Sequence, residues 1–179
     1  MSVQLTIDEI FEVAVRIEKD GAQFFRTGAL VSASVDCRRT LMELAQMEAD
    51  HELIFGAMRE GLHAGAAAAG QAAECPVDWT GMVHLFASDA LKGLAAGFSG
   101  RETPERIYRA AIDFEKDTIV FFLSFKRMLS SAADRGRLEQ IIREELGHLL
   151  LLSGKLAEVL APSGGAGRTD RPKLDAPTA

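Results

Sequence analysis

The sequence predicts an all-α fold, a four-helix bundle built from two antiparallel helical hairpins with a long crossover between them. Alanine and leucine dominate its apolar 47%, whereas runs of β-branched residues are few and short. Apolar residues recur at helical spacing in four long segments, which two short breaks and one long break separate. A chain of 179 residues can enclose one core of this kind without disulfides, so we expect a single domain over residues 1–161.

The first hairpin is predicted at residues 6–29 and 34–62. Thr6, followed three residues later by Glu9, fits a capping box, in which a side chain at each position bonds the backbone of the other at a helix start. The break at residues 31–32 is too short for anything but an antiparallel return. The second helix carries an apolar stripe that also contains two polar residues, Glu48 and His51.

A long connection and a second hairpin follow. Residues 65–80 are rich in alanine and glycine and are predicted as a loop, and residues 82–95 as a short crossover helix. Thr103 before Pro104 predicts the start of a third helix at 104–128, because proline suits the first helical position. The fourth helix is predicted at 131–160. Residues 162–179 have almost no apolar side chains to bury and are predicted to be a disordered tail.

Composition excludes several classes of function. The net charge is −6 with both signs interspersed, so nucleic acid is not expected as a partner. Cys37 and Cys75 lie too far apart for a C-x-x-C redox pair, and two cysteines cannot form a four-cysteine zinc site. The N-terminal residues are too acidic for a signal peptide, and no stretch approaches the roughly 20 apolar residues of a membrane span. We therefore expect a soluble, cytoplasmic protein with no membrane partner.

A duplicated motif carries the chemistry. Each half of the chain contains a Glu-Lys-Asp-x-x-x-Phe-Phe segment, and thirty residues after its glutamate a Glu-x-x-His segment. Every residue of the second copy follows its counterpart by 97 positions, which indicates an internal duplication. One Glu-x-x-His pair is common on a solvated helix face. Two copies at a constant offset, both on the apolar stripes, are not explained by polar residues that merely face solvent. The residues concerned are Glu18, Glu48, His51, Glu115, Glu145 and His148.

These six residues predict a centre for two metal ions. Residues three apart on a helix share a face, so each Glu-x-x-His helix can present a carboxylate and an imidazole to one point. Four carboxylates facing one another in an apolar bundle repel, and two divalent cations neutralise them. Carboxylate-rich sites with one imidazole per metal favour iron or manganese, and iron is our prediction. Six side chains for two ions leave positions open to O2 or peroxide.

The motifs resemble the ferritin-like superfamily and, with the segment 94–100 (LAAGFSG), its rubrerythrin-type branch over residues 6–160. The resemblance implies that Glu48 and Glu145 bridge the two metals, that Glu18 and Glu115 are terminal ligands, and that His51 and His148 serve one metal each. It also implies association into a homo-oligomer, in this case a dimer. No catalytic residue beyond the metal ligands is expected.

Two departures from the rubrerythrin pattern affect the expected reaction. Rubrerythrins carry a further glutamate three residues after the third-helix ligand, where this chain has Thr118, and a rubredoxin domain whose paired cysteine motifs are missing here. We therefore expect a di-iron oxidoreductase that uses O2 or hydrogen peroxide, as a ferroxidase or a peroxidase. Its electrons would come from an external donor or from Fe(II) as substrate. The alternatives are iron binding, storage or delivery without turnover, and a helical interaction module without activity.

Other polar and aromatic residues are assigned to the scaffold. Asp20 and Asp117 lie about 200° round the helix from their glutamates and are expected to face solvent or a neighbouring helix. Tyr108 lies two turns before Glu115 on the same face, and packing is preferred over a redox role. We expect surface or capping roles for His63, His84 and Trp79, and core packing for Phe24, Phe25, Phe121 and Phe122.

Overall fold

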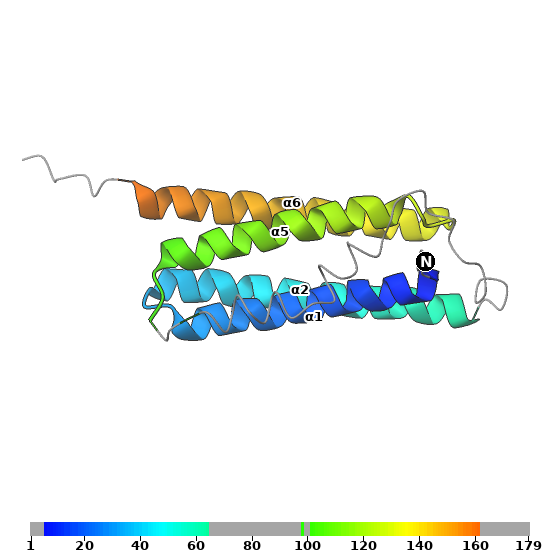
Figure 1. The fold of residues 1–179 in the computed structure, drawn as a ribbon, viewed down its shortest axis with the longest axis horizontal. Coiled ribbons are helices and arrows are strands. Elements are labelled where there is room, and N and C mark those ends of the chain that lie inside the picture. The colour runs from blue at the N-terminus through cyan, green and yellow to red at the C-terminus, as the bar shows by residue number, and fades with distance from the viewer. Residues whose placement is uncertain (1–5, 65–97, 99–100, 162–179) are drawn as a thin grey trace, which may run out of the picture.

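The computed structural model describes residues 6–64, 98 and 101–161, which form four long helices (Figure 1). Helix α1 spans Ile7–Val31 and α2 spans Val35–Ala64, while α5 spans Pro104–Lys126 and α6 spans Ala132–Leu160. The predicted all-α fold of paired hairpins is confirmed. The third helix ends two residues earlier than predicted, because the amide of Met128 turns back to the carbonyl of Phe125, 2.9 Å away, as a tight final turn.

The helices begin at the polar residues that the sequence offers as caps. The backbone amide of Glu9 donates to Thr6 Oγ1 at 3.2 Å and that of Thr6 donates to Glu9 Oε2 at 2.7 Å, so the predicted capping box is present. Thr103 caps α5 and Pro104 occupies its first turn. These caps satisfy amide groups that have no partner inside the helix, and so they fix where each helix starts.

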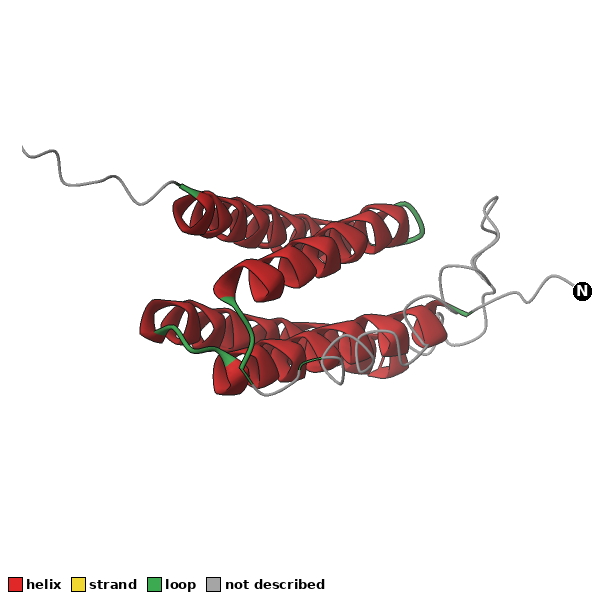
Figure 2. Cartoon of the chain, turned by 60° about the vertical axis from the view of Figure 1, so that its left-hand side comes forward, coloured by secondary structure: helices red, strands yellow, loops and turns green. Residues whose placement is uncertain are grey.

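The two hairpins form two layers, with α1 and α2 in one and α5 and α6 in the other (Figure 2). Within each layer the helices are antiparallel and joined by a turn of a few residues. The end of α1 is tied to the start of α5, because the amide of Glu102 donates to the carbonyl of Val31 at 3.1 Å. This contact brings the first hairpin against the second at one end of the bundle.

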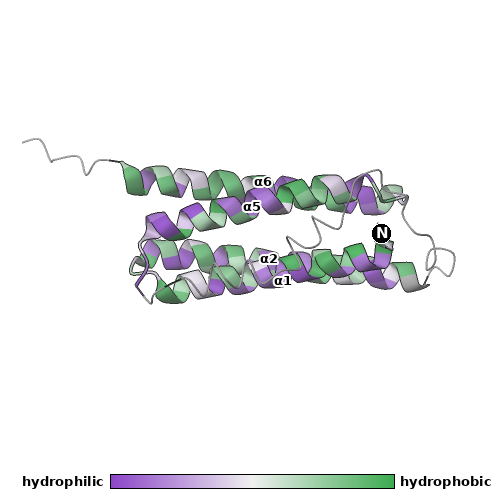
Figure 3. Cartoon of the chain, in the orientation of Figure 1, coloured by the Kyte–Doolittle hydropathy of each residue, from purple (hydrophilic) through white to green (hydrophobic). Residues whose placement is uncertain are grey.

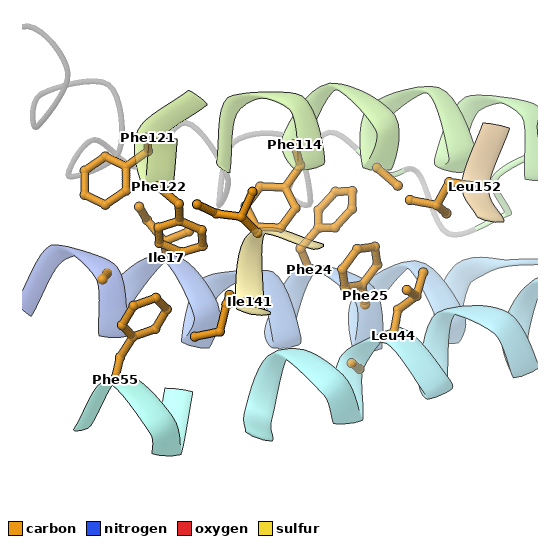
Figure 4. Close-up of a cluster of buried hydrophobic side chains, with 14 of the residues drawn as sticks. Ile17, Phe24, Phe25, Leu44, Phe55, Phe114, Phe121, Phe122, Ile141 and Leu152 are labelled. Carbon is orange, nitrogen blue, oxygen red and sulfur yellow. The ribbon is translucent and has the colours of Figure 1, made fainter. Parts of the chain in front are cut away.

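Hydrophobic residues recur along all four helices (Figure 3), and buried side chains from the two layers pack together into one core, part of which Figure 4 shows. Two groups of aromatic side chains lie apart from each other along it. In one, the Phe114 ring packs 6.0 Å from the rings of both Phe24 and Phe25, and in the other Phe55 packs 5.0 Å from Phe122. The predicted packing role of the duplicated phenylalanines is confirmed, since all four are fully buried.

Gly21 on α1 leaves room for the ring of Phe114 on α5. A Cβ atom placed on this residue would lie 2.7 Å and 2.9 Å from two ring atoms of Phe114, whose ring also packs 6.0 Å from the rings of Phe24 and Phe25. Overpacking of this kind typically costs about 1–3 kcal/mol. We therefore expect Gly21→Ala to lower the free energy of unfolding by that amount, measured by urea denaturation.

Gly154 in α6 supplies the matched control, since an added Cβ there meets nothing within 4 Å. Glycine inside a helix is less favourable than alanine by about 1 kcal/mol, so Gly154→Ala should raise the free energy of unfolding. Opposite signs for the two substitutions are the expected result. A gain in stability from Gly21→Ala would show that Phe114 does not hold its ring against α1.

Several predictions fall on residues outside the described part of the chain. These are the crossover helix at 82–95, the tail at 162–179, and the roles of Cys75, Trp79 and His84. No helix within the described ranges has the length and apolar character to cross a membrane.

Candidate metal centre

The six residues of the duplicated motif meet inside the bundle. On α1 and α5 the glutamate of the cluster stands in sequence between large buried apolar residues. Glu18 lies between Phe11 and Phe24 on α1, and Glu115 between Phe114 and Phe121 on α5. Helices α2 and α6 each contribute a glutamate and, one turn later, a histidine. All four glutamates are fully buried, and both histidines are nearly so: Glu18, Glu48, Glu115, Glu145, His51 and His148.

Glu48 and Glu145 lie in the middle of the cluster and turn one oxygen toward each histidine. Glu145 Oε1 lies 2.8 Å from His51 Nδ1, and its Oε2 lies 3.0 Å from His148 Nδ1. Glu48 has the same arrangement, with Oε2 at 3.8 Å from His51 Nδ1 and Oε1 at 3.2 Å from His148 Nδ1. Both carboxylates therefore belong to both halves of the cluster.

Glu18 and Glu115 each belong to one half only. Glu18 Oε2 lies 3.6 Å from His51 Nδ1, and Glu115 Oε1 lies 3.5 Å from His148 Nδ1. The side chains thus divide into two sets, in each of which one atom per residue lies within 4.8 Å of the others. The first set is Glu18, Glu48, His51 and Glu145, and the second is Glu48, Glu115, Glu145 and His148.

The cluster has more buried polar atoms than its own hydrogen bonds satisfy. Both oxygens of Glu18, Glu48 and Glu115 have no hydrogen-bond partner within the described residues. No lysine or arginine in the same part of the chain forms an ion pair with these carboxylates. Buried carboxylates without cations cost several kcal/mol each, so the arrangement is suited to divalent cations in both sets.

In the metal-free protein, protons take the place of cations. Burial and the negative charge of Glu48 raise the pKa of Glu18 well above its usual value, and burial also raises the pKa of Glu115. Burial alone would lower the pKa of His148, but its contacts with Glu115, Glu145 and Glu48 outweigh this and raise it to about 12. The pKa of His51 is raised in the same way.

The pKa values of the two shared carboxylates, Glu48 and Glu145, are lowered, whereas those of Glu18 and Glu115 are raised. Burial alone would raise the pKa of Glu48, but its contacts with Glu18 and with both imidazoles outweigh burial and lower the pKa to about 2. The pKa of Glu145 is also lowered, because contacts with His148, His51 and Glu115 outweigh burial and the charge of Glu48. These directions favour protons on Glu18, Glu115 and both imidazoles and negative charge on Glu48 and Glu145, a distribution in which two carboxylates and two imidazolium rings balance.

Glu144 is a residue of the site that the sequence did not reveal. Its Oε2 lies 2.8 Å from His51 Nε2, on the side of the ring opposite the cluster, and its Oε1 accepts a hydrogen bond from Gln140 Nε2 at 3.0 Å. The hydrogen bond with His51 lowers the pKa of Glu144. The 97-residue repeat did not indicate Glu144, because the corresponding position in the first half is Met47.

Thr118 is fully buried one turn after Glu115, and its hydroxyl has no hydrogen-bond partner in the described ranges. Leaving a buried hydroxyl unpaired costs about 1–3 kcal/mol. Thr118→Val removes the hydroxyl and keeps the shape, so we expect it to raise the free energy of unfolding of the metal-free protein by about 1 kcal/mol.

Urea denaturation measures this effect, with Thr27→Val as control. The Thr27 hydroxyl bonds the carbonyl of Gln23 near the surface, and its removal should change stability by less than about 0.5 kcal/mol. A loss of stability in Thr118→Val would mean that the hydroxyl has a partner after all.

Other residues singled out in the sequence lie outside the cluster. Asp117 is exposed and Asp20 partly so, as expected from their angle on the helix. Tyr108 is fully buried in the core beside Cys37 and Thr40, and burial raises the pKa of its phenol. The predicted packing role of Tyr108 is thus confirmed. The side chain of His63 is not described.

Comparison with known proteins supports the fold. No protein-family model matches the sequence, and no curated protein matches it. A crystal structure from Thermotoga maritima, described as a ferritin-like diiron-carboxylate protein, superposes with a TM-score of 0.65. The alignment covers 87% of this chain and 97% of the other, at 24% sequence identity. This chain has the ferritin-like fold. At that identity the likeness concerns the fold, and the case for a metal centre depends on the buried cluster.

Proposed function

We propose that this ferritin-like protein holds two iron ions in the six-residue cluster and acts as an oxidoreductase on O2 or hydrogen peroxide, of the ferroxidase or peroxidase type. The observation that carries the proposal is the pair of shared carboxylates. Glu48 and Glu145 each present one oxygen to each half, as two adjacent ions require of bridging ligands. Manganese has similar ligand preferences and is the alternative metal.

The remaining residues complete one ligand set for each ion. Glu18 and His51 would serve one ion, and Glu115 and His148 the other, each histidine through Nδ1. Two bound iron ions supply a redox couple able to pass electrons to O2 or peroxide. The chain keeps bulk water from this chemistry, because all six side chains are buried and aromatic rings lie before and after them along the bundle.

Thr118 bears on the reaction as well. It places a neutral hydroxyl at the position where rubrerythrins have a further glutamate, so four carboxylates remain for the two ions. A charge of −4 matches two Fe(II) ions, and oxidation of both leaves two positive charges in excess. Four carboxylates therefore balance the charge of two Fe(II) ions, and the two charges added on oxidation would have to be balanced by a further anion, such as one supplied by the oxidant.

Anaerobic loading with Fe(II) followed by O2 or hydrogen peroxide tests the proposal. The expected result is two Fe(II) per chain, consumption of oxidant in proportion to the iron, and a new near-ultraviolet absorption band. Two bound ions without oxidant consumption would instead assign a binding or delivery role, and loading far above two per chain would assign storage. Failure to bind iron would leave a helical interaction module. Sedimentation of the same samples tests the expected dimer.

A further inference from the structure

The two halves of the centre differ on their outer side. His51 Nε2 faces Glu144 Oε2 at 2.8 Å, whereas His148 Nε2 is buried and has no hydrogen-bond partner among the described residues. The sequence explains the difference. Glu144 precedes Glu145 on α6, and the matching position before Glu48 on α2 holds Met47, whose side chain cannot accept such a bond from an N–H with comparable strength.

We propose that Glu144 is a positioning residue which makes the two metal positions unequal, so that the ion bound by His51 is held more tightly and fills first. This inference rests on the proposed two-metal function. It assigns no ligand role to Glu144, which lies on the opposite side of the imidazole from the cluster.

The reason lies in the imidazole. A neutral histidine carries its proton on one ring nitrogen, and a carboxylate next to Nε2 holds that proton there, which leaves the Nδ1 lone pair free for a metal. The same hydrogen bond fixes the orientation of the ring. Within the described residues, His148 Nε2 has no such partner, so no second carboxylate there fixes the proton on Nε2 or orients the ring from its outer side.

The position of Glu144 suits this role rather than one in packing. Its side chain is 45% exposed, so its removal leaves little cavity, and Gln140 holds the carboxylate in place through its own hydrogen bond. A partner that orients a metal-bound histidine typically contributes about 10- to 100-fold in metal affinity. We expect an effect of that size on one ion and little on the other.

Anaerobic titration of the full-length chain with Co(II), followed by visible absorption and calorimetry, tests the inference. Wild type should bind two ions in two distinguishable steps. Glu144→Ala should weaken the tighter step about 10- to 100-fold, so that the steps merge, and Glu144→Gln should recover part of the loss because its carbonyl still accepts the Nε2 proton. Glu139→Ala, which removes another surface carboxylate of α6, is the matched control and should change neither step.

Nuclear magnetic resonance of the histidine rings gives a readout that a merely structural role would not change. With Zn(II) as a diamagnetic probe, we expect the Nε2 proton of His51 to be protected from exchange with water in wild type. In Glu144→Ala its resonance should disappear because the proton exchanges rapidly, and the His148 resonances should be unchanged. Met47→Glu should supply the missing partner and tighten the weaker step.

The possible outcomes are distinguishable. If wild type binds no metal, the proposed function fails. If it binds two ions but Glu144→Ala titrates like wild type, the inference alone is overturned. A loss of both steps together in Glu144→Ala, with a lowered free energy of unfolding, would also overturn it, because the residue would then support the fold and not one histidine.

Discussion

Replacing Glu48 or Glu145 by alanine is expected to abolish binding of both metal ions. Each of these carboxylates presents one oxygen to each half of the cluster, so its loss removes a ligand from both ions at once. It also removes one of the two shared negative charges between the ions, so the repulsion between adjacent divalent cations is less well compensated. Metal content after anaerobic loading and gel filtration should fall from two ions per chain to near zero.

Replacing Glu18 or Glu115 should have a smaller and different effect. Each contacts one histidine only, so Glu18→Ala leaves the second set of four ligands complete, and Glu115→Ala leaves the first. We expect each variant to retain about one ion per chain. Glu43→Ala, at an exposed position on the same helix as Glu48, serves as control and should retain two.

This difference between shared and unshared glutamates is the sharpest test of the centre. If the glutamates were merely buried acids, the four alanine variants would all bind alike. Equal metal content in Glu48→Ala and Glu18→Ala would contradict the bridging assignment. The fold can be checked independently by circular dichroism, since the removal of a buried acid from the metal-free protein should not unfold four helices held by an aromatic core.

The sequence allowed the positions of the cluster to be predicted because two independent periodicities coincide there. The helical period places residues three apart on one face, and the 97-residue repeat shows which polar residues interrupt the apolar stripes in both halves. The caps at Thr6 and Thr103 were also predictable, since capping depends on neighbours in the chain.

The features that escaped prediction depend on contacts between helices. Glu144 lies next to Glu145 in sequence and so about 100° away on the helix, where a carboxylate would ordinarily face solvent. Only the packing of α6 against α2 brings it to His51. The contact of the Phe114 ring with Gly21 is a similar case. In the 97-residue repeat Phe114 corresponds to Ile17 and Gly21 to Thr118, so the repeat does not pair a phenylalanine with a glycine in both halves.

Metal binding is expected to release about four protons for every two ions bound at neutral pH. The metal-free cluster keeps protons on Glu18 and Glu115, because burial raises their pKa, and on His51 and His148, because the surrounding carboxylates raise theirs. All four must leave before the same atoms can hold metal. Calorimetry in buffers of different ionisation enthalpy measures the number released.

The same protons give the metal-free protein an unusual dependence of stability on pH. A group whose pKa is raised by folding stabilises the folded state fully below its unfolded pKa, and this stabilisation is lost as pH rises toward the folded value. For Glu18 and Glu115 the loss begins above about pH 4.3, and for His51 and His148 above about pH 6.5. Glu48 and Glu145 act in the opposite sense, and their contribution disappears as pH falls below about 4.3.

Stability of the metal-free protein should therefore be greatest at about pH 4.3, where these opposite contributions balance, and should fall steadily above it and through the interval from about pH 6 to 9, whereas metal affinity should rise over that interval. Urea denaturation at several pH values, with and without Co(II), measures both trends. The double variant Glu18→Gln with Glu115→Gln imitates the two protonated acids, so its stability should fall less with pH, the remaining fall coming from the histidines. If the free energy of unfolding of the metal-free protein instead rose between pH 6 and 9, the glutamates of the cluster would be ionised in the folded state. Cations other than protons would then be needed to neutralise them even before metal is added.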